Sequence, residues 1–326
     1  MSESEGRNLG RISSHNQDAL PGSIRLRLPA TSANLGPGFD AVGVALKLAL
    51  TIEARPLQVM DATSPELTIA ATGRDAERCA RTTNNMIFET YREVLTGAGR
   101  ELVPLDLRIH NEIPLGMGCG SSAAARLGAV MLANHFGGLG WSQRACIEEA
   151  TRREGHPDNV AACALGYVTV SVVSDGAVHS AICGQQLAWK LVLAFPPVSL
   201  ATEKARAMLP AEYSRVDAVA NVQRTALLVA AFALGRGDLL RVAMQDRMHQ
   251  PYRMEACPLL DRLLPLAGEA GVLGVALSGA GPGVLLVVEA DVAPAEIAAR
   301  IRQATGDPAL EIVETSIGPG ATEESI

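Results

Sequence analysis

The sequence predicts an α+β protein built from two mixed domains, and three observations support this prediction. The chain has 326 residues, which exceeds one typical domain. Hydrophobic residues make up 48% of it, enough for a large buried core. Short apolar segments that alternate like strands occur in both halves of the chain, together with segments of helical periodicity.

Charge and cysteine usage narrow the class of protein. The net charge is −7 and no run of Lys or Arg stands out, so nucleic acid is not the expected partner. Six cysteines are scattered without a C-x-x-C pair, which favours reduced thiols. No apolar run approaches the roughly 20 residues of a bilayer span, and no signal-peptide core precedes residue 30. We therefore expect a soluble, cytoplasmic protein with no membrane partner.

The first ordered segments follow a polar beginning. Residues 1–23 are rich in Ser, Asn, Gly and charge, which predicts a mobile tail. The alternation from Ile24 to Leu28 predicts a half-buried strand that Pro29 stops. A Gly- and Pro-rich loop follows, flanked by Asn34 and Asp40. These two side chains either cap the loop or meet a ligand.

Two strands and a helix come next. Residues 42–52 and 67–71 read as strands, and the Asn-Asn sequence at 84–85 begins a helix that runs to about residue 95. As a helix start, Asn85 is by itself explained as an N-cap.

The central feature of the chain is a glycine-rich turn that opens a helix. After a strand-like stretch from 105 to 113 come Gly116, Gly118 and Gly120, then Ser121 and Ser122 and a long apolar helix. Unpaired N–H groups and the positive end of the helix dipole make such a turn a phosphate cradle. It is neither a Walker loop, which requires Gly-Lys-Ser/Thr, nor a dinucleotide fingerprint.

Polar chemistry gathers after a second helix from Trp141 to Arg153, for which Ser142 is the expected N-cap. The segment from Glu154 to Val160 is too polar, and too broken by Gly and Pro, to be packing material. Phosphoryl transfer needs a carboxylate for Mg²⁺ and donors for the second substrate, and this segment can supply both.

The C-terminal half continues the mixed pattern. Strands are predicted at 166–173, 191–195, 272–278 and 284–288, and amphipathic helices at 216–234 and 239–248. The last two strands are joined by a Gly-Ala-Gly-Pro-Gly turn at 279–283, which by itself reads as a hairpin.

Five motifs in this order resemble those of the GHMP small-molecule kinases, and of the homoserine kinases among them. They are the twelve residues 29–40 (PATSANLGPGFD), the phosphate loop 114–124, the segment 154–161 (EGHPDNVA), the segment 202–210 (TEKARAMLP) and the turn 278–283 (SGAGPG). Asn221, Asp246, His249 and the Gln-Pro-Tyr-Arg stretch ending at Arg253 also match family positions. The resemblance covers the chain from Ile24 to about Val288.

The resemblance implies a fold and a reaction. The fold would be an N-terminal domain like the second domain of ribosomal protein S5, over residues 24–185, followed by a ferredoxin-like domain over 186–320. The activity would be ATP-dependent phosphorylation of L-homoserine to O-phospho-L-homoserine, on the route to threonine. The sequence leaves the oligomeric state open, with a homodimer as one candidate.

The resemblance also implies roles for particular residues. Asn34, Glu154 and Arg206 would be catalytic, with Asn34 steadying the reacting hydroxyl or the γ-phosphate. Ser122 and Glu154 would hold Mg²⁺, with Glu148 or Glu149 as alternatives to Glu154. The homoserine amino group would meet Asp40 and His156, and the homoserine carboxylate would meet Arg206 and Arg253. Asn159 would be a further residue that binds homoserine. ATP would be bound by Asn85 and by the loop residues Pro114, Leu115, Gly116, Met117, Gly118, Cys119, Gly120, Ser121 and Ser122.

A few positions depart from the family pattern. Met117 and Cys119 stand where family members often carry Arg and Leu, and Ala162 replaces a common Pro. Gly283 replaces a Thr, which puts any role of that hydroxyl in doubt.

Two rival functions stay open: a GHMP kinase for another small alcohol, and a catalytically silent paralogue that binds a nucleotide or an amino acid. The kinase assignment requires Gly118, His156 and Arg206 to line one shared cavity.

Overall fold

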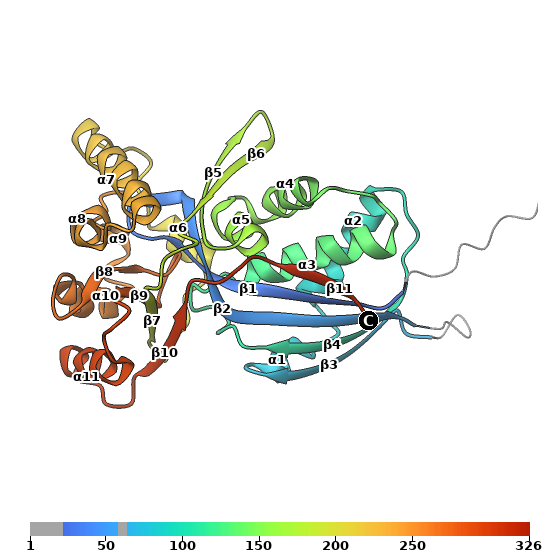
Figure 1. Ribbon diagram of the computed structural model, residues 1–326. Helices are drawn as coiled ribbons and strands as arrows, with labels where there is room; N and C mark the ends of the chain where they lie inside the picture. Colours follow the sequence, from blue (N-terminus) through green and yellow to red (C-terminus); the bar gives the residue numbers. More distant parts are fainter. Residues whose placement is uncertain (1–21, 58–63) are drawn as a thin grey trace, which may run out of the picture.

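The computed structural model describes residues 22–57 and 64–326. It has two lobes, with β1–β4, α1–α5 and β11 in one and most of the remaining elements in the other (Figure 1). The tail predicted for residues 1–23 lies, apart from its last two residues, outside the described residues.

The first lobe is built on a seven-stranded sheet. Its main path is β11 (Thr322–Ser325), β1 (Ile24–Asn34), β2 (Gly38–Pro56), β4 (Leu105–Asn111) and β3 (Leu67–Gly73). All neighbours on this path are antiparallel except β3 and β4, which run parallel. The hairpin of β5 (Val168–Ser174) and β6 (Ala177–Cys183) pairs with the start of β2 and projects from the molecule (Figure 1).

Helices cover one face of this sheet and bury its apolar side chains. They are α2 (Met86–Gly97), α3 (Ser121–Phe136), α4 (Gln143–Glu154) and α5 (Asp158–Leu165), while the short α1 (Ala76–Cys79) follows β3. Alternate residues of β1, such as Ile24, Leu26 and Leu28, are fully buried in the resulting core. The core therefore fixes the ends of α3, α4 and α5, where the predicted site residues lie.

The second lobe is a four-stranded sheet in the order β10 (Glu311–Ser316), β7 (Lys190–Phe195), β9 (Val284–Val288) and β8 (Val272–Leu277). Its helices are α6 (Thr202–Ala207), α7 (Arg215–Leu234), α8 (Leu240–Ala243), α9 (Gln250–Arg253), α10 (Pro258–Leu263) and α11 (Pro294–Thr305). Both faces of the sheet are buried: Leu191 and Leu193 face the core shared with the first lobe, and Val192 and Ala194 face α10 and α11. This explains why β7 reads as a continuous apolar run.

The prediction that Pro29 stops the first strand is wrong. β1 continues through Pro29 to Asn34, with a register shift against β2 between Pro29 and Thr31. β11 pairs with β1 only from Ile24 to Arg27, so no strand on that side needs an N–H from position 29. A proline is tolerated in a strand where its missing donor has no partner.

The helix predicted from 239 to 248 is also wrong in extent. α8 ends at Ala243, because the carboxylate of Asp246 accepts hydrogen bonds from the N–H groups of Met248, His249 and Gln250 at 2.9, 2.8 and 2.6 Å. Those bonds start a new helix, α9, at Gln250. Apolar periodicity alone could not reveal this break.

Among the described residues, α7 is the one helix that has the length and apolar composition of a bilayer span. Of the residues in its most apolar 18-residue stretch, 22% are buried inside the protein. Hydrogen bonds hold α7 to the loop at residues 34–40. The Nδ2 of Asn221 and the Oγ1 of Thr225 both donate to the carbonyl of Pro37, at 2.7 and 2.8 Å. α7 therefore serves as a wall behind the loop at 34–40.

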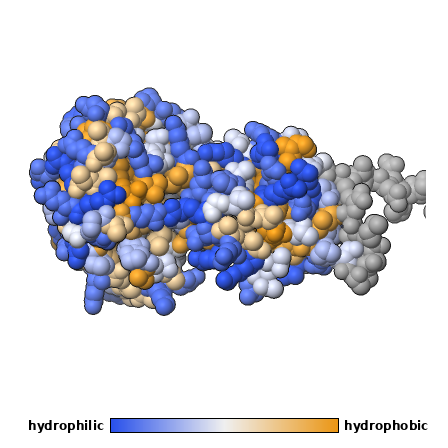
Figure 2. Space-filling view, turned by 90° about the horizontal axis from the view of Figure 1, so that it is seen from below, coloured by the Kyte–Doolittle hydropathy of each residue, from blue (hydrophilic) through white to orange (hydrophobic). Residues whose placement is uncertain are grey.

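The chain returns to the first lobe at its end. After β10, the N–H of Gly318 donates to the carbonyl of Ala45, and the N–H of Ala321 donates to that of Cys163, before β11 joins β1. Viewed from below, the surface is mostly hydrophilic with separate apolar clusters on each lobe (Figure 2). The domain bounds 24–185 and 186–320 stay a prediction, with β11 lying on the first sheet.

Candidate active site

The glycine-rich loop makes three turns of positive φ before α3 begins. The φ angle is +74° at Gly116, +79° at Gly118 and +66° at Gly120, a region that glycine enters without the steric cost of a Cβ. Among the described residues, no side chain caps the start of α3. The first N–H groups of α3 are therefore left for an external acceptor, as in an anion-binding helix start.

A loop from the second lobe lies directly against this turn. The Oγ of Ser278 donates to the carbonyl of Gly118 at 2.8 Å, and a Cβ on Gly118 would come within 2.0 Å of the carbonyl oxygen of Ser278. Asn34 adds to the junction, because its Nδ2 donates to the carbonyl of Gly279 at 2.9 Å while its Oδ1 accepts from the N–H of Asp40 at 3.1 Å. Three of the sequence motifs thus meet at one place.

Glu154 ends α4 beside the start of α3. Its Oε2 accepts a hydrogen bond from the Oγ of Ser122 at 2.8 Å. The same oxygen lies 2.8 Å from the Nε of Arg126, whose Nε–H is not aimed at any acceptor among the described residues, so that contact is ionic. A carboxylate, a hydroxyl and a free helix start therefore come together here.

The two alternative carboxylates lie elsewhere. Glu148 pairs with Arg144 at 2.9 Å, and Glu149 pairs with Arg152 and Arg153 at 2.8 Å each. Both carboxylates line a groove between α4 and the β5–β6 hairpin rather than the cavity beside the glycine-rich loop. The hydrogen bond from Arg144 lowers the pKa of Glu148 below its usual value. Burial raises the pKa of Glu149, but the hydrogen bonds and charges of Arg152 and Arg153 together outweigh it and lower that pKa.

Two adjoining cavities open at the loop. The first brings together Gly118, His156 and Arg206, as the kinase assignment requires. The second, of about 310 Å³, lies between β4 and the start of α2 and includes Asn85 and Leu115. Residues that line both are Gly116, Ser121 and Ser122. The first is also lined by Asn34, Phe39, Asp40, Cys119, Gly120, Glu154, Asp158, Asn159 and Arg253.

Asn85 matches both interpretations open to it. Its Oδ1 accepts from the N–H groups of Ile87 and Phe88 at 3.1 and 3.2 Å, and its Nδ2 donates to the carbonyl of Arg81 at 2.9 Å. It is thus the N-cap of α2, and it also forms part of the wall of the second cavity. Pro114 and Met117, by contrast, line neither cavity.

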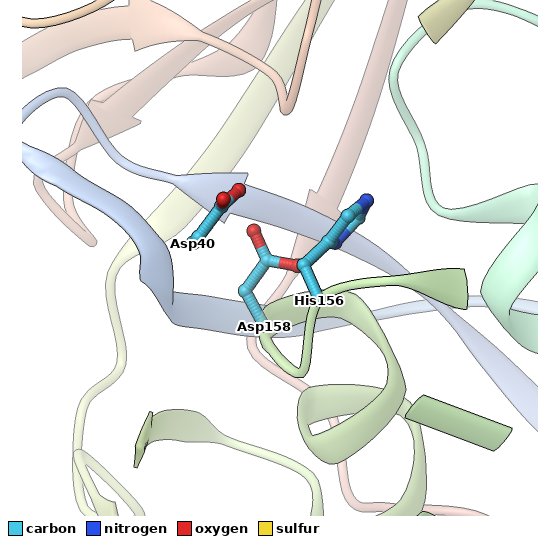
Figure 3. A group of neighbouring side chains, drawn as sticks. All are labelled: Asp40, His156 and Asp158. Carbon is cyan, nitrogen blue, oxygen red and sulfur yellow. The ribbon is translucent and has the colours of Figure 1, made fainter. Parts of the chain in front are cut away.

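Asp40, His156 and Asp158 form an acidic cluster in the wall of the first cavity. One carboxylate oxygen each of Asp40 and Asp158 and a ring nitrogen of His156 lie within 4.8 Å of one another (Figure 3). The Nδ1 of His156 lies 2.7 Å from the Oδ1 of Asp158. Burial lowers the pKa of His156, but the hydrogen bond and charge of Asp158, aided by Asp40 and Glu154, outweigh it and raise that pKa above its usual value.

Asn159 is oriented by a residue of the first motif. Its Oδ1 accepts a hydrogen bond from the Oγ1 of Thr31 at 2.6 Å, and its Nδ2 donates to the Oδ1 of Asp158 at 3.2 Å. Because Thr31 occupies the amide oxygen, the group that Asn159 offers to the cavity is its remaining N–H.

Two arginines close the cavity from the second lobe. Arg206 binds both oxygens of Asp40, at 2.7 and 2.9 Å. Arg253 is 2% exposed and donates from Nε to the carbonyl of Ala205 at 3.1 Å. Both guanidinium groups contact the ring of Phe39, with the Cζ of Arg206 at 5.4 Å and the Cζ of Arg253 at 5.7 Å from the ring centroid. Burial and the neighbouring charge of Arg206 lower the pKa of Arg253.

Sequence reasoning missed three residues of this arrangement: Thr31, Phe39 and Asp158. Each lies inside a motif that was recognised, but none was given a role. For Asp158 a signal existed, because an acidic residue directly after Pro157 is typical of the first turn of a helix. The contacts of Thr31 and Phe39 join distant segments and have no local signal.

Several known proteins are similar to this chain over most of its length. It matches the GHMP kinases N terminal domain over residues 85–167 and the GHMP kinases C terminal domain over 228–307. It is 46% identical to a homoserine kinase of Solibacter usitatus, over 82% of this chain and 85% of that protein. It is 39% identical to a homoserine kinase of Synechocystis sp., over 89% and 93%. The crystal structure of a homoserine kinase from Cytophaga hutchinsonii shares the fold, with a TM-score of 0.78 and 23% identity over 97% of this chain and all of the other.

Proposed function

The chain belongs to the GHMP kinases and, within them, to the homoserine kinases, and on that premise we propose how its residues transfer a phosphoryl group from ATP to L-homoserine. The product is O-phospho-L-homoserine, an intermediate on the route to threonine. The observation that carries the assignment of residues is the single cavity shared by the glycine-rich loop, the acidic cluster and the two arginines.

The nucleotide side of the site is the loop and the second cavity. The amides from Gly116 to Ser122 point their unpaired N–H groups at the phosphates of ATP. The adenosine occupies the 310 Å³ cavity beside Asn85, since this cavity shares three residues with the phosphate site. In the loop, Pro114 has no N–H to offer and acts by shaping the turn.

The donor set at Glu154 fits a magnesium ion. Mg²⁺ prefers oxygen ligands and is usually held by one or two carboxylates plus phosphate oxygens, and Glu154 and Ser122 supply a carboxylate and a hydroxyl 2.8 Å apart. When bound, the ion would neutralise charge on the transferring phosphoryl group. Glu148 and Glu149 are poorer choices because both line the groove between α4 and the β5–β6 hairpin, away from the cavity beside the glycine-rich loop.

The opposite side of the cavity fits an amino acid. Asp40, Asp158 and His156 form an acidic end that suits the ammonium group, and Arg206 and Arg253 form a basic end that suits the carboxylate. A guanidinium matches a carboxylate because its planar fork donates two parallel hydrogen bonds. Held at both ends, homoserine directs its hydroxyl toward the loop.

The reaction then depends on positioning and charge. The homoserine oxygen forms a bond to the γ-phosphorus as the bond to the bridging oxygen of ADP breaks. In a loose transition state the hydroxyl proton leaves late and can pass to an oxygen of the transferred phosphoryl group, so no strong general base is needed. The remaining N–H of Asn159 donates to an oxygen of the reacting groups, and Asn34 keeps the loop at 34–40 against the turn at 279.

The rival functions make different use of the same cavity. A kinase for a small alcohol without a carboxylate has no need for the paired arginines, and a silent paralogue has no need for Glu154 beside Ser122. Both features favour the homoserine reaction. A cytoplasmic location and a homodimer stay predictions, and size-exclusion chromatography with light scattering tests the second.

A coupled assay of ADP release tests the function directly. Homoserine, mevalonate and galactose are compared as acceptors at equal ATP and Mg²⁺, with a reaction lacking acceptor as the background. We expect release above background with homoserine alone. Release above background with mevalonate or galactose, or none above background with homoserine, would contradict the proposal.

A further inference from the structure

His249 is fully buried between the two lobes and has no part in the reaction described above. Its Nε2 lies 2.7 Å from the carbonyl oxygen of Gly36, in the first motif. Its Nδ1 lies 3.0 Å from the Nη1 of Arg253, in the carboxylate clamp. One imidazole therefore connects a loop of the first lobe to a substrate-binding residue of the second.

The two partners fix the protonation state of the ring. A carbonyl oxygen only accepts, so the Nε2 of His249 carries the hydrogen that is donated to Gly36. A guanidinium only donates, so the Nδ1 of His249 carries the lone pair that receives the Nη1–H of Arg253. His249 is therefore a neutral imidazole, in agreement with burial and the charge of Arg253, which lower its pKa despite the opposing charge of Asp246.

These bonds leave Arg253 one free edge. Its Nε–H is used by the carbonyl of Ala205 and its Nη1 by His249. The guanidinium plane is thus held at two points, and Arg253 reaches the cavity with its remaining N–H groups. Without the acceptor at His249, only the bond from Nε to Ala205 would hold the plane against rotation about the Cδ–Nε bond.

The ring is itself firmly held, so it can act as a fixed reference. The backbone N–H of His249 donates to the Oδ2 of Asp246 at 2.8 Å. One face stacks on Phe39, with ring centroids 5.3 Å apart and planes at 27°. Because Phe39 precedes Asp40, the same imidazole supports the loop that carries the ammonium-binding carboxylate.

We propose that His249 is a positioning residue for homoserine: its Nδ1 lone pair sets the orientation of Arg253, and its Nε2–H ties that arginine to the loop that carries Asp40. The proposal rests on the proposed function, because Arg253 is the group through which it acts. It predicts an effect on homoserine binding and none on the nucleotide, which binds at the other end of the cavity.

Two amide substitutions separate the two bonds of the ring. In His249→Asn the amide oxygen can take the place of Nδ1 and accept from Arg253, while the bond to Gly36 is lost. In His249→Gln the amide nitrogen can take the place of Nε2 and donate to Gly36, while the acceptor for Arg253 is lost. We measure KM for homoserine and for ATP, kcat, and homoserine affinity by calorimetry without nucleotide. His179→Gln, on the exposed strand β6, is the control.

His249→Gln is expected to raise the homoserine KM and dissociation constant about tenfold or more, the scale of a lost hydrogen bond to a charged group, with the ATP KM unchanged. His249→Asn loses the neutral bond to Gly36, which contributes less than a bond to a charged group, so we expect a smaller rise in the homoserine KM, of about threefold to tenfold. In an Arg253→Ala background, His249→Gln should add nothing further, because its partner is gone.

Three results would overturn the proposal. They are a wild-type homoserine KM in His249→Gln, an equal loss of homoserine and ATP affinity in both variants, and additive effects in the Arg253→Ala background. Wild-type protein that binds and phosphorylates no homoserine would instead overturn the function itself, and with it this role. Circular dichroism melting curves identify a variant that fails to fold, and the remaining variant then decides.

Discussion

Asp40 and Arg206 form a two-pronged ion pair across the cavity, with Nη2 to Oδ1 at 2.7 Å and Nη1 to Oδ2 at 2.9 Å. Asp40 lies on β2 of the first lobe, and Arg206 lies on α6 of the second. We have proposed that each meets one end of homoserine. A zwitterion can replace this pair without loss, because its carboxylate takes Arg206 while its ammonium takes Asp40. A ligand with only one of these charges would leave a partner unpaired.

Asp40→Asn should therefore weaken discrimination between homoserine and 4-hydroxybutanoate, which lacks the amino group. We expect the homoserine KM to rise about tenfold or more, on the scale of a charged hydrogen bond, and the KM for 4-hydroxybutanoate to change less. Steady-state kinetics with both acceptors measure the ratio. Asp238→Asn is the matched control, since Asp238 forms a similar pair with Arg236 on the surface. An unchanged ratio in Asp40→Asn would remove Asp40 from substrate recognition.

Glu154→Gln should lower kcat by about 100-fold, the scale of removing one electrostatic stabiliser of a transition state. It should also weaken binding of Mn²⁺, used as a probe for Mg²⁺ and followed by electron paramagnetic resonance in the presence of ADP. Glu149→Gln is the control because its partners lie in the other groove. If Glu149→Gln loses Mn²⁺ and Glu154→Gln retains it, the metal assignment belongs to the alternative carboxylate.

Homoserine binding should weaken as the solution becomes acidic. The pKa of His156 is raised above its usual 6.5, so the imidazole gains its positive charge at a pH above that value. A charged imidazole repels the ammonium group, hence affinity is present above the folded pKa and is lost as the pH falls through it. Titration calorimetry with homoserine between pH 5 and 8.5 follows this loss, and His156→Asn should flatten the profile. Affinity that instead increases in acid would put His156 next to the phosphates.

Gly283→Thr, which restores the common family residue, should be harmful in this chain. A Cβ at position 283 would lie 2.5 Å from the carbonyl oxygen of Met117 and 3.0 Å from the ring of Phe195. Relief of that overlap must move the phosphate loop, so we expect a higher ATP KM and a free energy of unfolding lower by about 1–3 kcal/mol. Gly97→Thr is the control, because a Cβ there meets no atom within 4 Å. Equal melting temperatures and ATP KM values for the two variants would show that the loop has room.

Local sequence signals predicted the elements around the site well. Ser142 is the N-cap of α4 and Asn85 that of α2, each with a side-chain oxygen on the expected backbone N–H groups. The helix expected at 216–234 occurs at Arg215–Leu234. Such signals depend on neighbours within one helical turn, and a sequence states those directly.

Features set by distant partners could not be predicted in the same way. Pro29 sits inside β1 because β11, nearly 300 residues later, stops pairing at Arg27. α8 ends early because Asp246 binds three backbone N–H groups. No prediction covered α11, β10 or β11. In the site, the motifs named most of the lining residues, yet the bond from Thr31 to Asn159 depends on packing that no spacing reveals.

The return of the chain to β1 limits how the substrate cavity can open. Two covalent connections join the lobes, one from β6 to β7 and one from β10 to β11. The second is hydrogen-bonded to Ala45 and Cys163 along its length, so it cannot act as a free hinge. The loop at 34–40 is also bonded to Gly279 and to α7. Entry of the amino acid and exit of its phosphate ester are therefore expected to depend on small movements of α6, rather than on the lobes swinging apart.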